Sequence, residues 1–115
     1  NKSKNQLMEK LKTFVNKGKR IHCYGASTKG NVLLQYYGIN NKIVEFAAER
    51  NKLKYNLFTP GSKIRIISEK LSRSLEPDYY LVLPWHFKNE ILMREKFMRK
   101  KGVKFIFPLP NLKII

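Results

Sequence analysis

The amino-acid sequence predicts an α/β fold, a Rossmann-like three-layer sandwich built on a mainly parallel sheet of about five strands. Three observations predict it. Short apolar runs alternate with segments whose apolar residues repeat at helical spacing. A glycine-containing turn directly follows the first apolar run. The 115 residues, 43% of them hydrophobic, suffice to bury one core, so we expect a single domain over residues 1–115.

The sequence begins with a predicted helix and a predicted strand. Ser3 and Gln6 form a capping-box pattern before apolar residues at helical spacing, and Gly18 supplies the helix stop. Residues 20–24 include apolar and aromatic side chains and end abruptly at Gly25, which is typical of a buried strand that runs into a loop.

A second helix and two further strands are expected next. Apolar residues at helical spacing run from Val32 and stop at Gly38. Residues 43–48 predict the second strand, and residues 59–61 a turn before a short third strand at 63–67.

The C-terminal part predicts two helices and two strands. Ser68 is placed to cap a helix that ends at Leu75, and residues 79–83 form the clearest strand of the chain. A helix is expected over residues 88–100, followed by a strand at 104–107. The last helix carries a broad apolar stripe made of Ile91, Leu92, Met93, Phe97 and Met98.

Sheets of this kind bind ligands outside the carboxyl ends of their strands, near the switch in strand order. Three segments fall at such ends: residues 25–31, 49–51 and 84–87. We therefore expect the functional site to be built from them.

The first of these segments has the chemistry of a phosphate site. Gly25 allows a tight turn, Ser27 and Thr28 offer hydroxyl groups, and Lys29 adds a positive charge. Free backbone N–H groups at the start of the following helix also favour an anion. The alternative is a tight strand-to-helix turn in which Ser27 or Thr28 only caps the helix.

Two known phosphate-binding motifs match this segment incompletely. A dinucleotide-binding fingerprint needs glycine at positions 25, 27 and 30, and Ser27 stands between Gly25 and Gly30. A P-loop needs lysine where Asn31 stands.

The other two segments offer polar side chains with two interpretations each. Glu49, near the end of the second strand, is placed to accept hydrogen bonds from ribose hydroxyls, or to pair with Arg50 at the surface. His86 follows Trp85 and could bind phosphate or move a proton, but a histidine packed between aromatic residues is the alternative. His22, inside a strand, is expected to be a core residue.

The composition bounds the function. There are 24 Lys and Arg against 8 Asp and Glu, a net charge of +16, and the basic residues are spread along the chain. We expect solvated faces, while a small basic nucleic-acid-binding module is the alternative function. The single cysteine excludes an internal disulfide. No apolar run approaches the roughly 20 residues of a membrane helix, so we expect a soluble, cytoplasmic protein without a membrane partner.

Five strings, in this order and at these distances, resemble one known family. They are GASTKGN (residues 25–31), ERN (49–51), TPG (59–61), PDYYLVLPWHF (77–87) and KFIFPLP (104–110). Together they are similar to the C-terminal domain of S-adenosylmethionine-dependent sugar C-methyltransferases, which methylate a carbon of nucleotide-linked keto-deoxysugars. The resemblance extends from about Arg20 to Pro110.

The resemblance implies that this chain is the C-terminal part of a longer methyltransferase. Its upstream part would hold zinc, the methyl donor S-adenosylmethionine and most general acid–base residues, and would pack against this domain. The domain itself would bind no cofactor or metal, contain no catalytic residue unless His86 is one, and bind the nucleotide-linked sugar. The implied substrate-binding residues are Gly25, Ser27, Thr28, Lys29, Gly30, Asn31, Glu49, Arg50, Asn51, Trp85 and His86.

The sequence departs from the family pattern at two positions. The family commonly has aspartate where this chain has Glu49, and proline where it has Lys52. A longer carboxylate in a less rigid loop leaves the ribose contact open.

Overall fold

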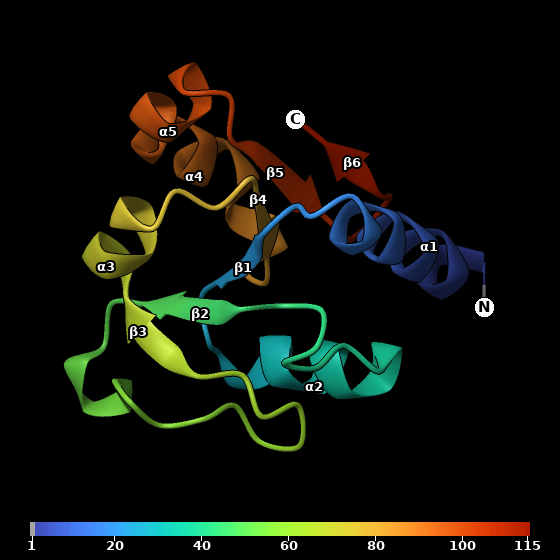
Figure 1. Ribbon diagram of the computed structural model, residues 1–115, viewed down its shortest axis with the longest axis horizontal. Coiled ribbons are helices and arrows are strands. Elements are labelled where there is room, and N and C mark those ends of the chain that lie inside the picture. Colours follow the sequence, from blue (N-terminus) through green and yellow to red (C-terminus); the bar gives the residue numbers. More distant parts are fainter. Residues whose placement is uncertain (1) are drawn as a thin grey trace.

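The computed structural model describes residues 2–115, in which a six-stranded sheet lies between two layers of helices (Figure 1). The strands are β1 (Ile21–Tyr24), β2 (Phe46–Glu49), β3 (Ile66–Ser68), β4 (Tyr79–Val82), β5 (Lys104–Phe107) and β6 (Lys113–Ile114). The α-helices are α1 (Lys2–Asn16), α2 (Thr28–Tyr37), α3 (Glu69–Ser74), α4 (Lys88–Arg94) and α5 (Lys96–Lys100). Two 3₁₀ turns, η1 (Lys52–Lys54) and η2 (Trp85–Phe87), complete the elements.

The strand order is β3-β2-β1-β4-β5-β6, which is the order of a Rossmann sheet. Strands β1 to β5 are parallel to their neighbours, and β6 runs antiparallel to β5. The central strand β1 is buried along its whole length, because parallel neighbours need crossover helices that cover both faces. The predicted Rossmann-like sandwich is confirmed.

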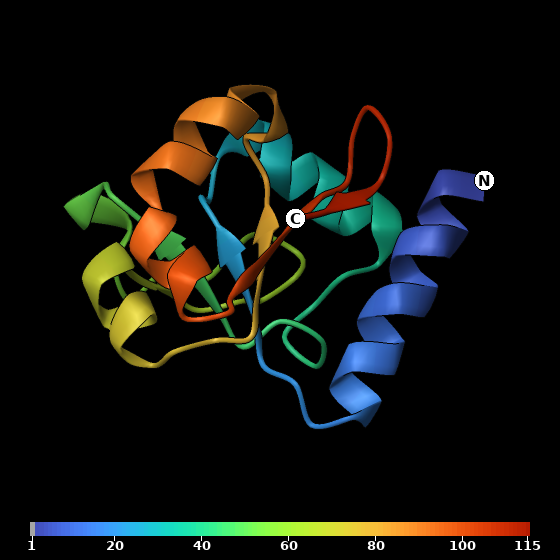
Figure 2. The same cartoon turned by 90° about the horizontal axis from the view of Figure 1, so that it is seen from above.

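The helices divide between the two faces of the sheet (Figure 1 and Figure 2). Leu11 of α1 and Leu34 of α2 belong to one buried cluster. Ile91 of α4 and Met98 of α5 pack with Phe105 in the other. Consequently the chain leaves β1 toward one face and β4 toward the opposite face. Because β1 and β4 are neighbours, this change of face opens a crevice between their carboxyl ends.

Several predicted boundaries shift in the structure. Ser3, expected as a cap, lies inside α1, where burial of Leu7 and Leu11 stabilises the helix without it. The second strand begins three residues later than expected, at Phe46, and the third at Ile66. Strand β6 was not expected, because two residues are too few for a sequence pattern and their pairing with β5 is a tertiary contact.

The expected single helix over residues 88–100 is wrong, since the structure has two helices that meet at Glu95. A helical spacing puts Glu95 on the same face as Ile91 and Met98, so its carboxylate points into the protein, where Glu95 is 2% exposed. Met93 and Phe97, expected in the apolar stripe, are largely exposed instead.

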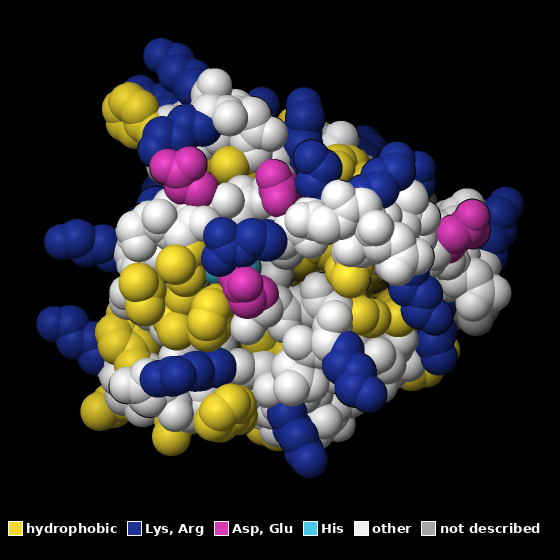
Figure 3. Space-filling model, in the orientation of Figure 1, with side chains coloured by type: hydrophobic (Ala, Val, Ile, Leu, Met, Phe, Trp, Pro, Cys, Tyr) yellow, Lys and Arg dark blue, Asp and Glu magenta, His cyan; other side chains and the backbone are white. Residues whose placement is uncertain are grey.

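On the face shown in Figure 3, the Lys and Arg side chains are spread over many elements and do not gather into one basic patch. On the same face, hydrophobic side chains gather over β3 and the segment before it. That segment contains the exposed residues Leu53, Leu57 and Phe58.

The first turn of α2 packs very tightly on the end of β4. A Cβ atom at Gly30 would lie 2.7 Å from the Cβ of Leu83, which is closer than two non-bonded carbon atoms approach in proteins. Leu83 is fully buried, so it has no room to move aside. Only glycine therefore allows α2 to start this close to the sheet.

A buried polar chain joins the sheet to α3. The Nε2 atom of His22 lies 2.8 Å from a carboxylate oxygen of Glu45, and its Nδ1 atom 2.7 Å from the Ser72 hydroxyl, which also bonds Tyr80. Because a carboxylate only accepts, Nε2 carries the proton and Nδ1 accepts from Ser72. Burial lowers the pKa of His22, and the hydrogen bond to Glu45 offsets this only in part.

Gly30→Ala is expected to lower the free energy of unfolding by about 1–3 kcal/mol, because the added methyl group overlaps Leu83. Urea unfolding followed by circular dichroism measures it. Lys29→Ala, an exposed change in the same turn, is the control and should stay within about 0.5 kcal/mol of the wild type. Equal stability of Gly30→Ala and the control would contradict the packing argument.

Stability is expected to fall as the pH drops from about 7.5 to about 5.5. An unfolded histidine has a pKa near 6.5, so below that pH the unfolded chain binds a proton that buried His22 resists. Urea unfolding at several pH values should show this slope in the wild type and in His86→Gln, and a smaller slope in His22→Asn. Proton NMR titration of the His22 imidazole gives a second measurement. An ordinary pKa for His22 would overturn the prediction.

Candidate functional site

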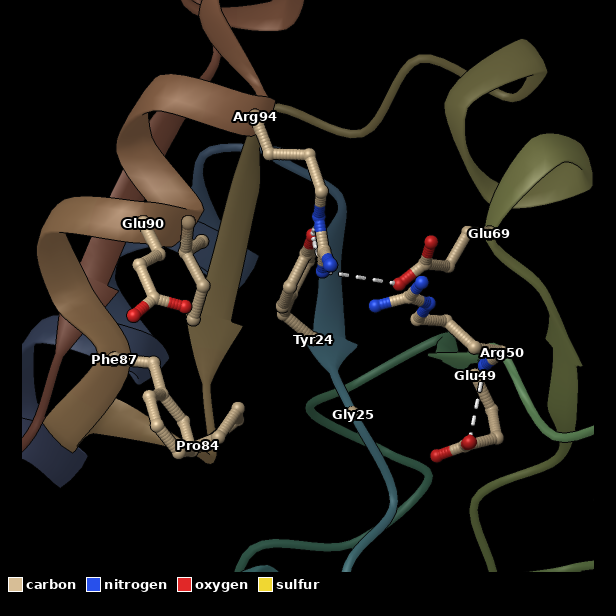
Figure 4. Close-up of a pocket in the computed structure, with 10 residues that line it drawn as sticks. Tyr24, Gly25, Glu49, Arg50, Glu69, Pro84, Phe87, Glu90 and Arg94 are labelled. Atoms are coloured by element: carbon tan, nitrogen blue, oxygen red, sulfur yellow. Dashed lines mark hydrogen bonds and ion pairs between the residues drawn. The ribbon is translucent and has the colours of Figure 1, made fainter.

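A crevice of about 400 Å³ lies at the switch in strand order, at the carboxyl ends of β1, β2 and β4 (Figure 4). One wall comes from the start of α4 and the loop before it, and the other from the ends of β2 and β3. The lining residues are Tyr24, Gly25, Glu49, Arg50, Glu69, Pro84, Phe87, Glu90, Ile91 and Arg94.

The turn after β1 is shaped by Gly25, whose φ of +91° is a conformation that residues with a side chain rarely adopt. A Cβ atom there would also lie 3.2 Å from the Pro84 side chain. The turn therefore brings the end of β1 and the end of β4 close together.

The start of α2 presents hydrogen-bond donors. Ser27 caps the helix, with its hydroxyl oxygen accepting from the Gly30 amide at 3.1 Å. The amides of Thr28 and Lys29 have no acceptor within residues 2–115, as expected for a first helical turn. Lys54 reaches the same turn from η1 and donates to the Ala26 carbonyl at 3.1 Å. An anion placed here would meet amides, the helix dipole and two ammonium groups.

Glu49 fastens the end of β2 to this turn. One carboxylate oxygen accepts from the Ala26 amide at 3.1 Å, and the other accepts from the amides of Arg50 and Asn51 at 3.0 and 2.8 Å. The carboxylate thus has a structural function that the sequence did not reveal. The ribose contact expected for it stays a prediction.

The expected site residues do not all line one cavity. Gly25, Glu49 and Arg50 line the crevice. Thr28, Lys29 and Trp85 line a separate, almost wholly apolar hollow of about 500 Å³ beside α2. Trp85 also lines a third hollow with His86, next to the last two strands. The expected segments therefore meet at one edge of the sheet but face different hollows.

Of three other expected site residues, Gly30 and Asn51 have structural roles and Asn31 has none that the contacts reveal. Gly30 packs on Leu83. The side chain of Asn51 accepts from the Leu53 amide and caps η1. The side-chain oxygen of Asn31 is buried without a hydrogen-bond partner within the described part of the chain.

The exposed ring of His86 lies near the rings of both aromatic neighbours in the sequence. Its ring centroid lies 4.3 Å from that of Phe87 and 5.8 Å from that of Trp85. Its side chain is exposed and does not line the crevice, so the expected functions in phosphate binding or proton transfer stay predictions. His22, expected in the core, is fully buried as predicted.

Sequence reasoning missed Tyr24, Glu69, Glu90 and Arg94 as lining residues, and Lys54 as a cation at the turn. The i,i+4 spacing of Glu90 and Arg94 could have placed them on one helix face. No sequence pattern indicates Lys54, because its position depends on how the segment after β2 folds back.

A charged network forms the floor of the crevice. The Tyr24 hydroxyl donates to Glu95 at 2.8 Å and accepts from the Arg94 guanidinium. Arg73 makes two hydrogen bonds to the Glu95 carboxylate, at 2.6 and 2.9 Å, and Glu69 lies 3.3 Å from Arg73 and 3.5 Å from Arg94.

The network fixes the protonation of its members. Burial raises the pKa of Tyr24, so the phenol keeps its proton at neutral pH. Burial also pushes the pKa of Glu95 upward, but the hydrogen bonds from Arg73 and Tyr24 outweigh it and leave the pKa lowered. Glu95 is therefore a buried carboxylate held by Arg73.

Comparison with known proteins identifies the family. Residues 1–110 match the family described as "C-methyltransferase C-terminal domain", and the chain belongs to it. Over 110 residues, 96% of this chain, it is 36% identical to "C-methyltransferase NovU" from Streptomyces niveus. The chain spans about a quarter of the length of that curated relative, 26% of it. The resemblance to C-methyltransferases is thereby confirmed.

Among residues 2–115, no helix combines the length and the apolar character that crossing a bilayer requires. In the same residues, His, Cys, Asp and Glu side chains form no group of three suited to a metal ion.

Arg73→Ala is expected to lower the free energy of unfolding by about 3 kcal/mol, because it leaves the Glu95 carboxylate buried without its main partner. Chemical denaturation measures the loss. Adding Glu95→Gln to the variant removes the unpaired charge and should restore most of the stability. If Arg73→Ala is as stable as the wild type, the ion pair between Arg73 and Glu95 does not stabilise the floor of the crevice.

Proposed function

We propose that this C-methyltransferase domain binds the diphosphate of a nucleotide-linked sugar and performs no methyl transfer by itself. The observation that carries the proposal is the first turn of α2, whose donor groups and nearby ammonium groups stand at the same carboxyl edge of the sheet as the crevice. Family membership supports a substrate-handling role in C-methylation.

The charges near this turn suit a diphosphate. Thr28 and Lys29 offer free amides at the positive end of a ten-residue helix, and Lys29 and Lys54 bring ammonium groups from two separate segments. Arg50, on the neighbouring wall, adds a guanidinium that can bond phosphate oxygens in pairs. Lys29 in the first turn of α2, and Arg50 and Lys54 after β2, lie near the same carboxyl edge of the sheet, although the Lys29 side chain lines the apolar hollow beside α2.

Binding the diphosphate far from the reacting carbon has a physical advantage. Methylation beside a ketone needs a base, a stabilised enolate and a methyl donor in line, and each requires the sugar to be held still. Binding energy from the remote nucleotide can supply that positioning. We assign the methyl donor, the zinc and the catalytic base to the upstream part of a longer polypeptide, and we expect that part to pack against this domain.

Calorimetric titration of the 115-residue chain with thymidine diphosphate tests the proposal. We expect measurable binding that Lys29→Ala and Lys54→Ala each weaken about tenfold, which corresponds to ~1.4 kcal/mol. Lys42→Ala removes an equal charge at the turn before β2, at the opposite end of the sheet, and should leave the affinity unchanged.

Two outcomes would contradict this function. One is the absence of heat at millimolar ligand in the wild type. The other is steeply salt-dependent binding to DNA or RNA that Lys29→Ala and Lys42→Ala weaken equally, which would favour the nucleic-acid-binding alternative.

A further inference from the structure

The edge of the sheet beside β3 exposes three large apolar side chains. Leu53, Leu57 and Phe58 are 86%, 55% and 60% exposed, and Figure 3 shows hydrophobic side chains gathered over this part of the surface. We propose that these three residues, the apolar edge, bind the surface of a membrane that contains anionic lipids. The apolar side chains enter the boundary between headgroups and acyl chains, and neighbouring cations bind the lipid phosphates. This proposal goes beyond the sugar-nucleotide function and does not depend on it.

Positive charge accompanies the apolar edge. Residues 50–68 include five Lys and Arg residues and no Asp or Glu. Lys52 is next to Leu53 in the turn η1, and Arg65 pairs with Phe58 in an isolated antiparallel bridge. Both Lys52 and Arg65 are exposed. The segment that presents apolar side chains therefore also attracts an anionic surface.

The acidic residues that flank this segment in the sequence do not cancel its charge. The carboxylate of Glu49 accepts from three backbone amides, and that of Glu69 lies 3.3 Å from Arg73 and 3.5 Å from Arg94. Both carboxylates line the crevice. Their charge is thus engaged elsewhere.

A hydrogen-bonded backbone holds the apolar edge in its exposed position. The Asn56 amide donates to the Ile66 carbonyl, and the Ile66 amide donates to the Leu57 carbonyl, both at 2.8 Å. Ile64 and Ile66 of the paired segment are buried, so they already occupy the core at this edge. Exposure of the three apolar side chains is therefore a property of the folded protein, and an exposed apolar cluster of this kind marks an interaction surface.

The shape and charge of the apolar edge favour lipid over other partners. None of its three side chains lines the crevice or either of the two hollows described above, whereas a helical peptide docks in a groove. A second copy would bring another net charge of +16 to the interface. Nucleic acid would pair with the cations but leave the apolar side chains in water.

Binding at a membrane surface needs no spanning segment. The expectation of no membrane partner rested on the absence of a long apolar run in the sequence. Surface binding requires only a few apolar side chains with cations beside them, which the sequence pattern alone does not reveal.

Cosedimentation of the 115-residue chain with lipid vesicles tests the proposal. The wild type should bind vesicles of phosphatidylcholine and phosphatidylglycerol about tenfold more tightly than vesicles of phosphatidylcholine alone. Phe58→Ala and Leu53→Ala should each weaken binding to the anionic vesicles about fivefold through lost apolar contact, and Lys52→Ala about fivefold through lost charge.

Two variants elsewhere on the surface are matched controls. Phe97→Ala changes a phenylalanine of α5 that is 68% exposed, and Lys42→Ala removes an exposed charge before β2. Each should change the affinity for anionic vesicles less than about twofold. Leu53 is 86% exposed, so Leu53→Ala keeps the test valid should Phe58→Ala disturb folding.

Three outcomes would overturn the proposal. If Phe97→Ala weakens binding as much as Phe58→Ala, or if neither Phe58→Ala nor Leu53→Ala weakens it, the vesicles only adsorb a basic protein. If the wild type binds no vesicles, the apolar edge does not bind lipid. Binding of an amphipathic peptide of leucine and glutamate would then assign the edge to a protein partner, and a dimer that Phe58→Ala dissociates would assign it to a second copy.

Discussion

The close approach of Gly30 to Leu83 sets the geometry on which the candidate site depends. It lets α2 begin directly over the carboxyl edge of the sheet, at the point where the chain leaves β1 for one face and β4 for the other. The amides at the start of α2 then lie at the same edge of the sheet as the crevice instead of being displaced outward by a side chain. A single missing Cβ atom thus links the packing of the core to the place where an anion can bind.

Electrostatics divides the two sides of this edge. The protein is strongly basic, yet half of its acidic residues, Glu49, Glu69, Glu90 and Glu95, lie in the lining or the floor of one crevice. Most of these carboxylates are held by amides or arginines, so they make the cavity more rigid. Their negative charge also disfavours the binding of anions inside it. The turn after β1, with Lys29 and Lys54, remains cationic. Such a division can orient a ligand that has a charged part and an uncharged part.

The sequence predicted the edge of the sheet at which the site lies, but not the cavity. It singled out Gly25, Glu49 and Arg50, because turns after parallel strands carry recognisable residues. It did not indicate Arg94, Glu90 or Lys54, whose positions depend on how α4 and η1 pack against the sheet. It also grouped Lys29 and Trp85 with the crevice residues, whereas their side chains line a hollow on the α2 side.

What the sequence by itself determined is the alternation of strands and helices, the Rossmann-like class and the family, since these follow from local patterns and rare strings of residues. Tertiary structure decided the break at Glu95, the pairing of β6 and the partners of each charge. The physical reason is that a buried carboxylate or a two-residue strand is stable only when a distant partner, such as Arg73 or Phe107, completes it. The residues that neighbour Glu95 or β6 in the sequence do not indicate which distant residue that partner is.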